Sequence, residues 1–129
     1  MNEHEEGFVR SFVVANKKER VAMLLANPKR RREYLKTLAH YRDLDVRHAK
    51  VVSPKVAHTP AEWLKLLRSK GASDMCWVVS EDAARDGKEI ELSEALRATI
   101  GAGMGTVLSC VPGKLAYFED EEQRRLLES

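Results

Sequence analysis

Hydrophobic and polar residues follow two different patterns along this chain. Before residue 71 the apolar positions recur every three or four residues, which is the spacing of one helical face. After Met75 they come in short runs of four or five residues, which are typical of buried strands. The pattern therefore predicts an α+β fold, in which a helical N-terminal half packs on a small, mostly antiparallel sheet formed by residues 75–118.

Local signals place the expected helices of the N-terminal half. Asn27-Pro28 and Thr59-Pro60 each combine a helix cap with a proline at the first helical position, where the missing N–H costs nothing. Glu62 completes a capping box with Thr59. The predicted helices run from about Glu5 to Ala15, from Pro28 to about Tyr41, and from Thr59 to Gly71. Another helix is expected to start at Asn16, unless Asn16 lies inside one long helix that continues the first.

The second half predicts strands joined by turns. Asp86-Gly87 and Pro112-Gly113 are typical turn pairs, and Ser93 is expected to cap one inserted helix that Gly101 ends. The predicted strands are Met75–Ser80, Lys88–Leu92, Val107–Val111 and Leu115–Phe118, with a brief extended piece at Lys50–Val52. Residues 119–129 are expected to form a charged tail with a last helical turn or two.

Length and composition fit one globular domain over residues 1–129. Hydrophobic residues make up 43% and charged residues 33% of the 129 positions, which is not the composition of a disordered chain. No apolar run approaches the roughly 18–20 residues of a membrane-spanning helix, and the N-terminus is acidic rather than signal-like. We therefore expect a cytoplasmic location and no membrane partner. Cys76 and Cys110 lie in apolar runs and are expected to be free, buried thiols.

Charge is distributed unevenly. Residues 10–70 carry 16 Lys and Arg against 5 Asp and Glu, whereas residues 71–129 carry 6 against 12. The mainly helical part, residues 1–70, is thus basic, and the sheet-forming part, residues 71–129, is acidic. This segregation indicates an anionic partner for the basic part, or a match between the two parts within or between molecules.

The most unusual local feature is a cationic run at the start of the predicted third helix. Cations in a first turn oppose the helix dipole and cost about 0.3–1 kcal/mol each at low salt, but together with free N–H groups they suit a bound phosphate. The expected anion or nucleic-acid contacts are Lys29, Arg30, Arg31, Arg32, Lys36, Arg42 and Arg47. The alternative is a solvated face, or pairing with the acidic half.

Two other groups of residues carry possible chemistry. His40, Asp43, Asp45 and His48 fall within nine positions and suggest a metal or an acid–base pair, against a polar connection with an aspartate-rich turn. Ser109-Cys110 suggests a nucleophile with His40, His48 or His58 as base, against buried packing of the strand.

Two patches need no catalytic explanation. The glycines at 101, 103 and 105 follow a helix and precede a strand, which is the reverse of a phosphate loop and favours a helix C-cap. The acidic residues of 81–91 favour protection of a sheet edge, with a surface for a basic partner as the alternative.

These observations lead to one main hypothesis. The protein is expected to be a small non-enzymatic binding module that engages phosphate groups, or a nucleic-acid backbone, through a basic helix and without a cofactor or metal. One alternative is a protein interaction or inhibitor module that uses segregated charge, including a homo-oligomer. A second alternative is a small hydrolase or nuclease that uses the His40–His48 cluster.

Overall fold

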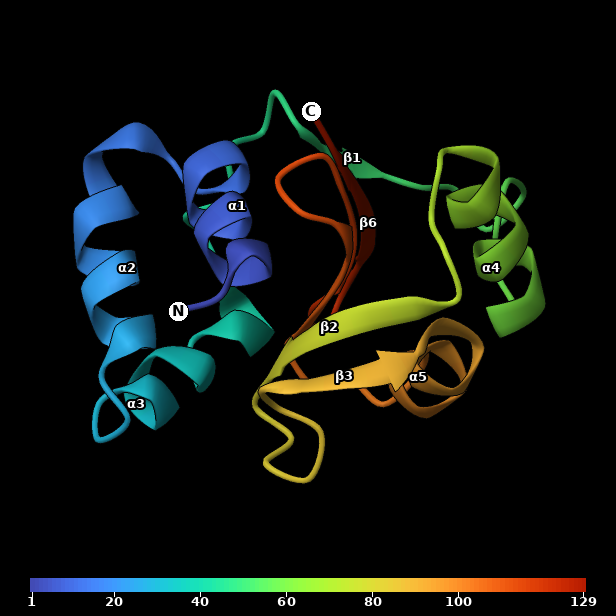
Figure 1. The fold of residues 1–129 in the computed structure, drawn as a ribbon. Coiled ribbons are helices and arrows are strands. Elements are labelled where there is room, and N and C mark those ends of the chain that lie inside the picture. Colours follow the sequence, from blue (N-terminus) through green and yellow to red (C-terminus); the bar gives the residue numbers. More distant parts are fainter.

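A six-stranded antiparallel sheet forms the centre of the protein. The computed structural model describes all residues, Met1–Ser129. The strands are β1 Ala49–Val51, β2 Met75–Ser80, β3 Lys88–Glu91, β4 Thr106–Val111, β5 Leu115–Glu119 and β6 Arg124–Glu128. They are ordered β1-β6-β5-β4-β2-β3, so β4 and β5 are central and β1 and β3 are edges. Helices cover both faces of this twisted sheet (Figure 1). The predicted α+β fold is confirmed.

Three helices and two short 3-10 turns cover one face, on the left in Figure 1. They are α1 Glu3–Phe12, η1 Ala15–Lys17, α2 Lys18–Ala26, α3 Arg31–Leu35 and η2 Leu38–His40. Asn2 caps α1 by accepting a hydrogen bond from the Glu5 N–H at 3.0 Å. Phe8 and Leu24 belong with Val107 and Phe118 of the sheet to one buried cluster, so the apolar stripes of these helices form the first core.

Two helices cover the opposite face, α4 Pro60–Ser69 and α5 Leu92–Thr99 (Figure 1, right). The predicted capping box is present, since Thr59 Oγ1 accepts from the Glu62 N–H at 3.1 Å and Glu62 accepts from the Thr59 N–H at 3.0 Å. Trp63 of α4 packs edge-on against Tyr117 of β5, with ring centroids 4.6 Å apart, in the second core.

The central strands alternate between the two cores. Val107 faces the first core and Leu108 the second, so β4 is buried on both sides as predicted. Cys76 and Cys110 are free and buried in the second core, as expected. Burial raises the pKa of Cys76 to about 12 and raises the pKa of Cys110 as well, so both thiols stay protonated at neutral pH.

The sheet extends beyond residues 75–118, which corrects the predicted boundaries. The expected charged tail contains β6, which pairs with β5 on one side and with β1 on the other. Leu126 faces the second core and Leu127 the first, so each apolar residue of this strand is buried on its own face. Two adjacent leucines in a charged segment give no periodic signal, and only pairing with β5 and β1 makes the segment a strand.

The predicted third helix over residues 28–41 is wrong in extent. Lys29 and Arg30 lie in a turn, α3 spans only Arg31–Leu35, and one 3-10 turn follows. The amides of Thr37 and His40 bond to carbonyls three residues back instead of four, and the Thr37 hydroxyl donates to the Tyr34 carbonyl at 2.7 Å. The helix therefore tightens and ends, and the cationic run does not line the start of a long helix.

Two predicted helix starts are also corrected. A 3-10 turn precedes α2, which begins at Lys18 without a side-chain cap, so Asn16 does not form the expected capping box. The N-cap of α5 is Glu91, and Ser93 lies inside the helix with its hydroxyl donating to Glu91 Oε1 at 2.6 Å. None of the helices has the length and apolar composition needed to cross a bilayer.

Candidate functional site

Arg31, the third residue of the cationic run, is held inside the protein. Its guanidinium binds the Glu5 carboxylate at 2.7 and 2.9 Å and the Asp86 carboxylate at 2.8 and 3.0 Å. Glu5 Oε2 also accepts from the Trp77 indole N–H at 2.8 Å. Arg31 thus joins α3 to α1 and to the β2–β3 connection. Its donors are occupied by the chain's own carboxylates, so we leave it out of any surface for an external anion.

The other predicted cations do not form one anion-binding site. Arg30 pairs loosely with Glu33 at 3.5 Å, Arg32 donates to a backbone carbonyl, that of Glu81, and Arg47 pairs with Asp45 at 2.7 Å. The hydrogen bonds from Arg47 lower the pKa of Asp45 to about 2. Lys29, Lys36 and Arg42 take part in none of the ten ion pairs of the molecule.

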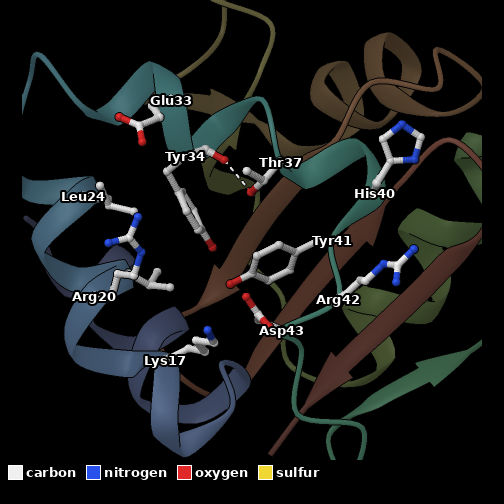
Figure 2. Close-up of a pocket in the computed structure, with 11 residues that line it drawn as sticks. Lys17, Arg20, Leu24, Glu33, Tyr34, Thr37, His40, Tyr41, Arg42 and Asp43 are labelled. Atoms are coloured by element: carbon white, nitrogen blue, oxygen red, sulfur yellow. Dashed lines mark hydrogen bonds between the residues drawn. The ribbon is translucent and has the colours of Figure 1, made fainter.

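One of these unpaired cations, Arg42, lies at a pocket that the sequence did not predict. Arg42 lines a hollow of about 270 Å³ between α2, α3 and the segment that follows η2. Figure 2 shows the residues that surround it. Lys17, Arg20, Val21 and Leu24 come from η1 and α2, Glu33, Tyr34 and Thr37 from α3 and its end, and His40, Tyr41, Arg42 and Asp43 from η2 and the residues after it.

The helical repeat places the residues of the α2 side. Positions 17, 20, 21 and 24 are separated by three or four residues and therefore share one face. Val21 and Leu24 are buried and form the wall, whereas Lys17 and Arg20 are exposed at the mouth. This face thus presents an apolar base with two cations above it.

Two tyrosines form the floor of the pocket. The rings of Tyr34 and Tyr41 meet edge-on at 5.6 Å, and Tyr41 also packs edge-on against Phe118. The residues are only 3% and 8% exposed, their hydroxyl oxygens are closed to solvent, and the two hydroxyls interact with each other but with no other group that donates or accepts a hydrogen bond. Buried hydroxyls are rarely left without a partner. The contact between these two hydroxyls is therefore the one polar interaction that each of them has in the core.

The charge of Asp43 acts on the same oxygens. In Figure 2 both tyrosine hydroxyls and the Asp43 carboxylate point toward one another in the middle of the pocket. Burial, followed by the neighbouring Tyr41 hydroxyl and then by the Asp43 charge, raises the pKa of Tyr34 well above its ordinary value. Burial and the Asp43 charge raise the pKa of Tyr41 to about 12, although its hydrogen bond with Tyr34 acts the other way. Both tyrosines are consequently neutral at physiological pH and can each donate and accept a hydrogen bond.

The mouth of the pocket carries three cations and one exposed carboxylate, that of Glu33, which pairs loosely with Arg30 at 3.5 Å. Lys17, Arg20 and Arg42, which we call the rim cations, form none of the molecule's ion pairs. Lys17 and Arg20 lie on the α2 side, and Arg42 extends outward on the other side of Tyr41 (Figure 2). The pocket thus has unpaired cations at its mouth and two buried tyrosine hydroxyls beneath its floor.

The histidine–aspartate cluster is not assembled as a catalytic or metal site. Only His40 and Asp43 line the pocket, and the His40 ring points away from the tyrosine hydroxyls (Figure 2). His40 Nδ1 lies 3.3 Å from Glu121, and Asp45 is bound by Arg47. The chain has no group of three His, Cys, Asp or Glu side chains placed to hold a metal ion.

Ser109 meets a histidine, but not one of the three predicted for it. Its hydroxyl lies 2.7 Å from His4 Nδ1, and the His4 ring stacks on Trp77. Ser109 is 4% exposed and faces α1, so this contact fastens the start of the chain to β4.

The backbone N–H groups of the glycine-rich loop already bind carboxylates of the same chain. The N–H groups of Gly101 and Gly103 donate to the buried Glu119 carboxylate, which also accepts from the Tyr117 hydroxyl at 2.7 Å. The Gly105 N–H donates to Glu81 Oε1 at 2.8 Å. Gly101, at φ 86°, directly follows Ile100, the C-cap of α5, which is where a left-handed glycine commonly ends a helix. The loop therefore has no free N–H groups at these positions for a phosphate.

The acidic and basic parts of the chain meet in part within the molecule. Arg31 binds Asp86, and Lys70 binds Glu128 at 3.2 Å. Glu89 and Glu91 lie exposed on β3, which is an edge strand as predicted. At these positions the basic and acidic parts of the chain neutralise each other, whereas the charges of the rim cations are not neutralised by an ion pair within the molecule.

Comparison with protein-family models, with curated proteins and with solved structures gives no match to this chain. Sequence reasoning identified Arg42 but missed Lys17 and Arg20, although their spacing to Leu24 was visible. It assigned Tyr34 and Tyr41 to the core, which is correct for the rings and incomplete for the hydroxyls.

Proposed function

We propose that this protein is a non-enzymatic binding module that engages the phosphate groups of a nucleic-acid backbone at the mouth of the α2–α3 pocket. The observation that carries the proposal is the set of three rim cations, Lys17, Arg20 and Arg42, which surround a pocket and have no ion-pair partner in the chain. Exposed cations of this kind gain most from an anion that arrives from outside.

The predicted cationic run takes a smaller part in this proposal. Lys29 lies in the turn before α3 and Lys36 directly after α3, and neither has an ion pair, so they add unpaired positive charge at the two ends of this helix. Arg30 and Arg32 are held by exposed contacts, which are weak and can be exchanged for a phosphate at little cost. Arg47 takes less part, because both ends of its guanidinium bind Asp45, whose side chain is only 13% exposed. Arg31 is excluded because its carboxylate partners are largely buried.

The protonation states of Tyr34 and Tyr41, at the floor of the pocket, favour a binding function over catalysis by proton transfer. A general base works best with a pKa near the operating pH. The pKa of Tyr34 and that of Tyr41 are both raised away from neutrality by burial, so these groups serve as hydrogen-bond partners. Phosphate attraction by the rim requires no chemical step.

The test removes the rim charge and measures the salt dependence of binding. The triple variant K17Q/R20Q/R42Q keeps long polar side chains and removes three positive charges. Each phosphate contact contributes about 0.7 to the slope of log affinity against log salt for a single strand. We therefore expect the slope to fall by about 2 and the affinity for a mixed-sequence oligonucleotide to drop at least about tenfold at low salt.

A matched control carries the same change of charge on the opposite face. K55Q/K65Q/R97Q alters three exposed cations around α4 and α5 that have no ion pairs. Its affinity and salt slope should equal those of the unaltered protein. Equal losses in the two triple variants would mean that only net charge matters, and an unaltered protein that binds no oligonucleotide at low salt would end the proposal.

A further inference from the structure

Cys76 and Cys110 lie opposite each other on neighbouring strands. Trp77 of β2 pairs with Ser109 of β4 in the antiparallel register, so one further step along each strand brings Cys76 opposite Cys110. Both thiols belong to the second core and therefore point to the same face of the sheet. Neither is part of a disulfide, and neither lines the α2–α3 pocket. The sheet thus brings together two thiols that the binding site does not use.

The hydrogen-bond pattern of β2 and β4 places this pair at a position that suits a disulfide. The register sets Glu81 opposite Gly105, and the Glu81 N–H donates to the Gly105 carbonyl at 3.1 Å. Hydrogen-bonded and non-hydrogen-bonded pairs alternate along antiparallel strands, so the cysteine pair is a non-hydrogen-bonded one. The Cα atoms of such a pair lie about 4.5 Å apart, which is within the roughly 4.4–6.8 Å that a disulfide spans.

A second pair of the same kind shows that side chains at these positions reach each other. Ser80 and Thr106 also face each other across β2 and β4, and their hydroxyl oxygens are 2.8 Å apart. The irregular register near Cys110 concerns the pairing of β4 with β5 and not with β2. Burial, followed by the neighbouring Cys76, raises the pKa of Cys110, in agreement with two sulfurs that lie close together. The two strands therefore hold the cysteines within reach of one another.

We propose that Cys76 and Cys110 form a disulfide when the protein meets a small-molecule disulfide such as glutathione disulfide. In the first exchange one cysteine thiolate attacks the glutathione disulfide and releases one glutathione thiolate. In the second, the other cysteine thiolate attacks the protein sulfur of the mixed disulfide and releases the second glutathione. Two protein thiols are oxidised, one glutathione disulfide is reduced to two thiols, and the protons of the protein thiols pass to the leaving thiolates.

Burial controls the rate of this reaction and not its equilibrium. Both cysteines are buried and protonated at neutral pH, so they react while the chain folds or when β2 and β4 open locally. The bond closes a loop over residues 77–109, which contains β3 and α5, and closing such a loop stabilises the folded state. Oxidation therefore adds a cross-link to the second core that reduction removes.

The test compares the equilibrium of this reaction in the folded and the unfolded chain. The unaltered protein is equilibrated with reduced and oxidised glutathione in buffer and, separately, in concentrated guanidinium chloride. Mass spectrometry after acid quenching then measures the fraction that has lost two hydrogens. Because the fold holds the sulfurs together, we expect the equilibrium constant to be at least about a hundredfold larger in buffer. The oxidised form should accordingly unfold at a urea concentration about 2 M higher than the reduced form.

The end point in each solution is approached from the reduced and from the oxidised protein, so that slow exchange is not mistaken for a small equilibrium constant. Cys76→Ala and Cys110→Ala each keep one thiol and should form at most the mixed disulfide with glutathione, without losing two hydrogens. An equilibrium constant in buffer no larger than that in guanidinium chloride would overturn the inference. The result is independent of oligonucleotide binding, since neither cysteine lines the α2–α3 pocket.

Discussion

Arg31 carries the most contacts of any cation in the chain. Its side chain is 17% exposed, and its guanidinium bridges the side chains of Glu5 and Asp86, which are 4% and 12% exposed. Burial by itself would lower the pKa of Arg31, but the hydrogen bonds to Asp86 and Glu5 more than offset it and raise that pKa. Three parts of the fold, α1, α3 and the β2–β3 connection, therefore depend on one charged side chain.

Replacing Arg31 with Met should destabilise the fold strongly. The change leaves two carboxylates near one another without their cation, and breaking a buried ion pair on one side costs about 3–5 kcal/mol. The expected result is a loss of that size in the free energy of unfolding, measured by urea denaturation with tryptophan fluorescence. Trp77, which donates to Glu5, reports the site directly.

Two further variants separate charge from packing. Arg30→Met removes the exposed neighbour and should change the free energy of unfolding by no more than about 0.5 kcal/mol. R31M/E5Q/D86N removes the stranded charges and should be more stable than R31M alone. If R31M unfolds at the same urea concentration as the unaltered protein, the network does not hold the elements together.

The sequence showed that this cation needed an anion but not which one. Four cations at the start of an expected helix indicated a negative partner, and for Arg31 the structure contains two such partners, the carboxylates of Glu5 and Asp86. Glu5 and Asp86 lie 26 and 55 positions away, and no local pattern connects such distant residues. The same limit applies to Tyr34 and Tyr41, whose rings are predictable as core while the environment of their hydroxyls depends on the whole fold.

At the level of elements, a close approach between η2 and the start of β4 determines where the pocket lies. A Cβ atom added to Gly105 would lie 2.3 Å from the backbone of both Leu38 and Ala39. Gly105 has no positive φ, so space and not conformation requires glycine here. The contact holds η2 against the sheet and thereby fixes the segment that carries Tyr41 and Asp43.

Gly105→Ala should therefore cost about 3 kcal/mol in the free energy of unfolding, the upper end for overpacking, because both clashing groups are backbone. The measurement is urea denaturation followed by circular dichroism. Gly87→Ala is the comparison, since Gly87 has a φ of 69° with open space around it. Its left-handed conformation should cost about 1 kcal/mol. If the two variants lose similar amounts of free energy of unfolding, then η2 moves away from the added methyl group at little cost.

The elements that the sequence predicted well are those with local signals. The start of α4 is encoded within four residues by Thr59 and Glu62, and both capping hydrogen bonds form. The third helix was predicted too long because its end depends on packing against Gly105, which lies about 65 positions further along the chain. The strand β6 was missed because its pairing with β5 and β1, and not its composition, makes it a strand.

At the scale of the whole molecule, one sheet separates two cores with different contents. The first core, under α1, α2 and α3, contains Tyr34 and Tyr41 beside the proposed site. The second, under α4 and α5, contains both thiols and Tyr117, whose hydroxyl is bound to Glu119. All three tyrosines of the chain are thus buried, two with hydroxyls that interact only with each other and one with a hydroxyl bound to a carboxylate.

This distribution predicts how the protein unfolds in alkali. Burial raises the pKa of each tyrosine above the ordinary value of about 10. A raised pKa in the folded state adds stability that is complete below pH 10 and is lost as the pH rises through the folded value, which is about 12 for Tyr41. The raised pKa of Cys76 and that of Cys110 start the same loss from about pH 9.

The ionisation of tyrosine should therefore coincide with unfolding. In a titration followed at 295 nm, phenolate absorbance is expected to stay flat through pH 10 and then rise in one cooperative step, together with the loss of the circular dichroism signal. In 6 M guanidinium chloride the same three groups should titrate near pH 10. A third of the absorbance change appearing near pH 10 in the folded protein would mean that one tyrosine is open to water, and a shift of that step in Tyr34→Phe or Tyr41→Phe would identify it.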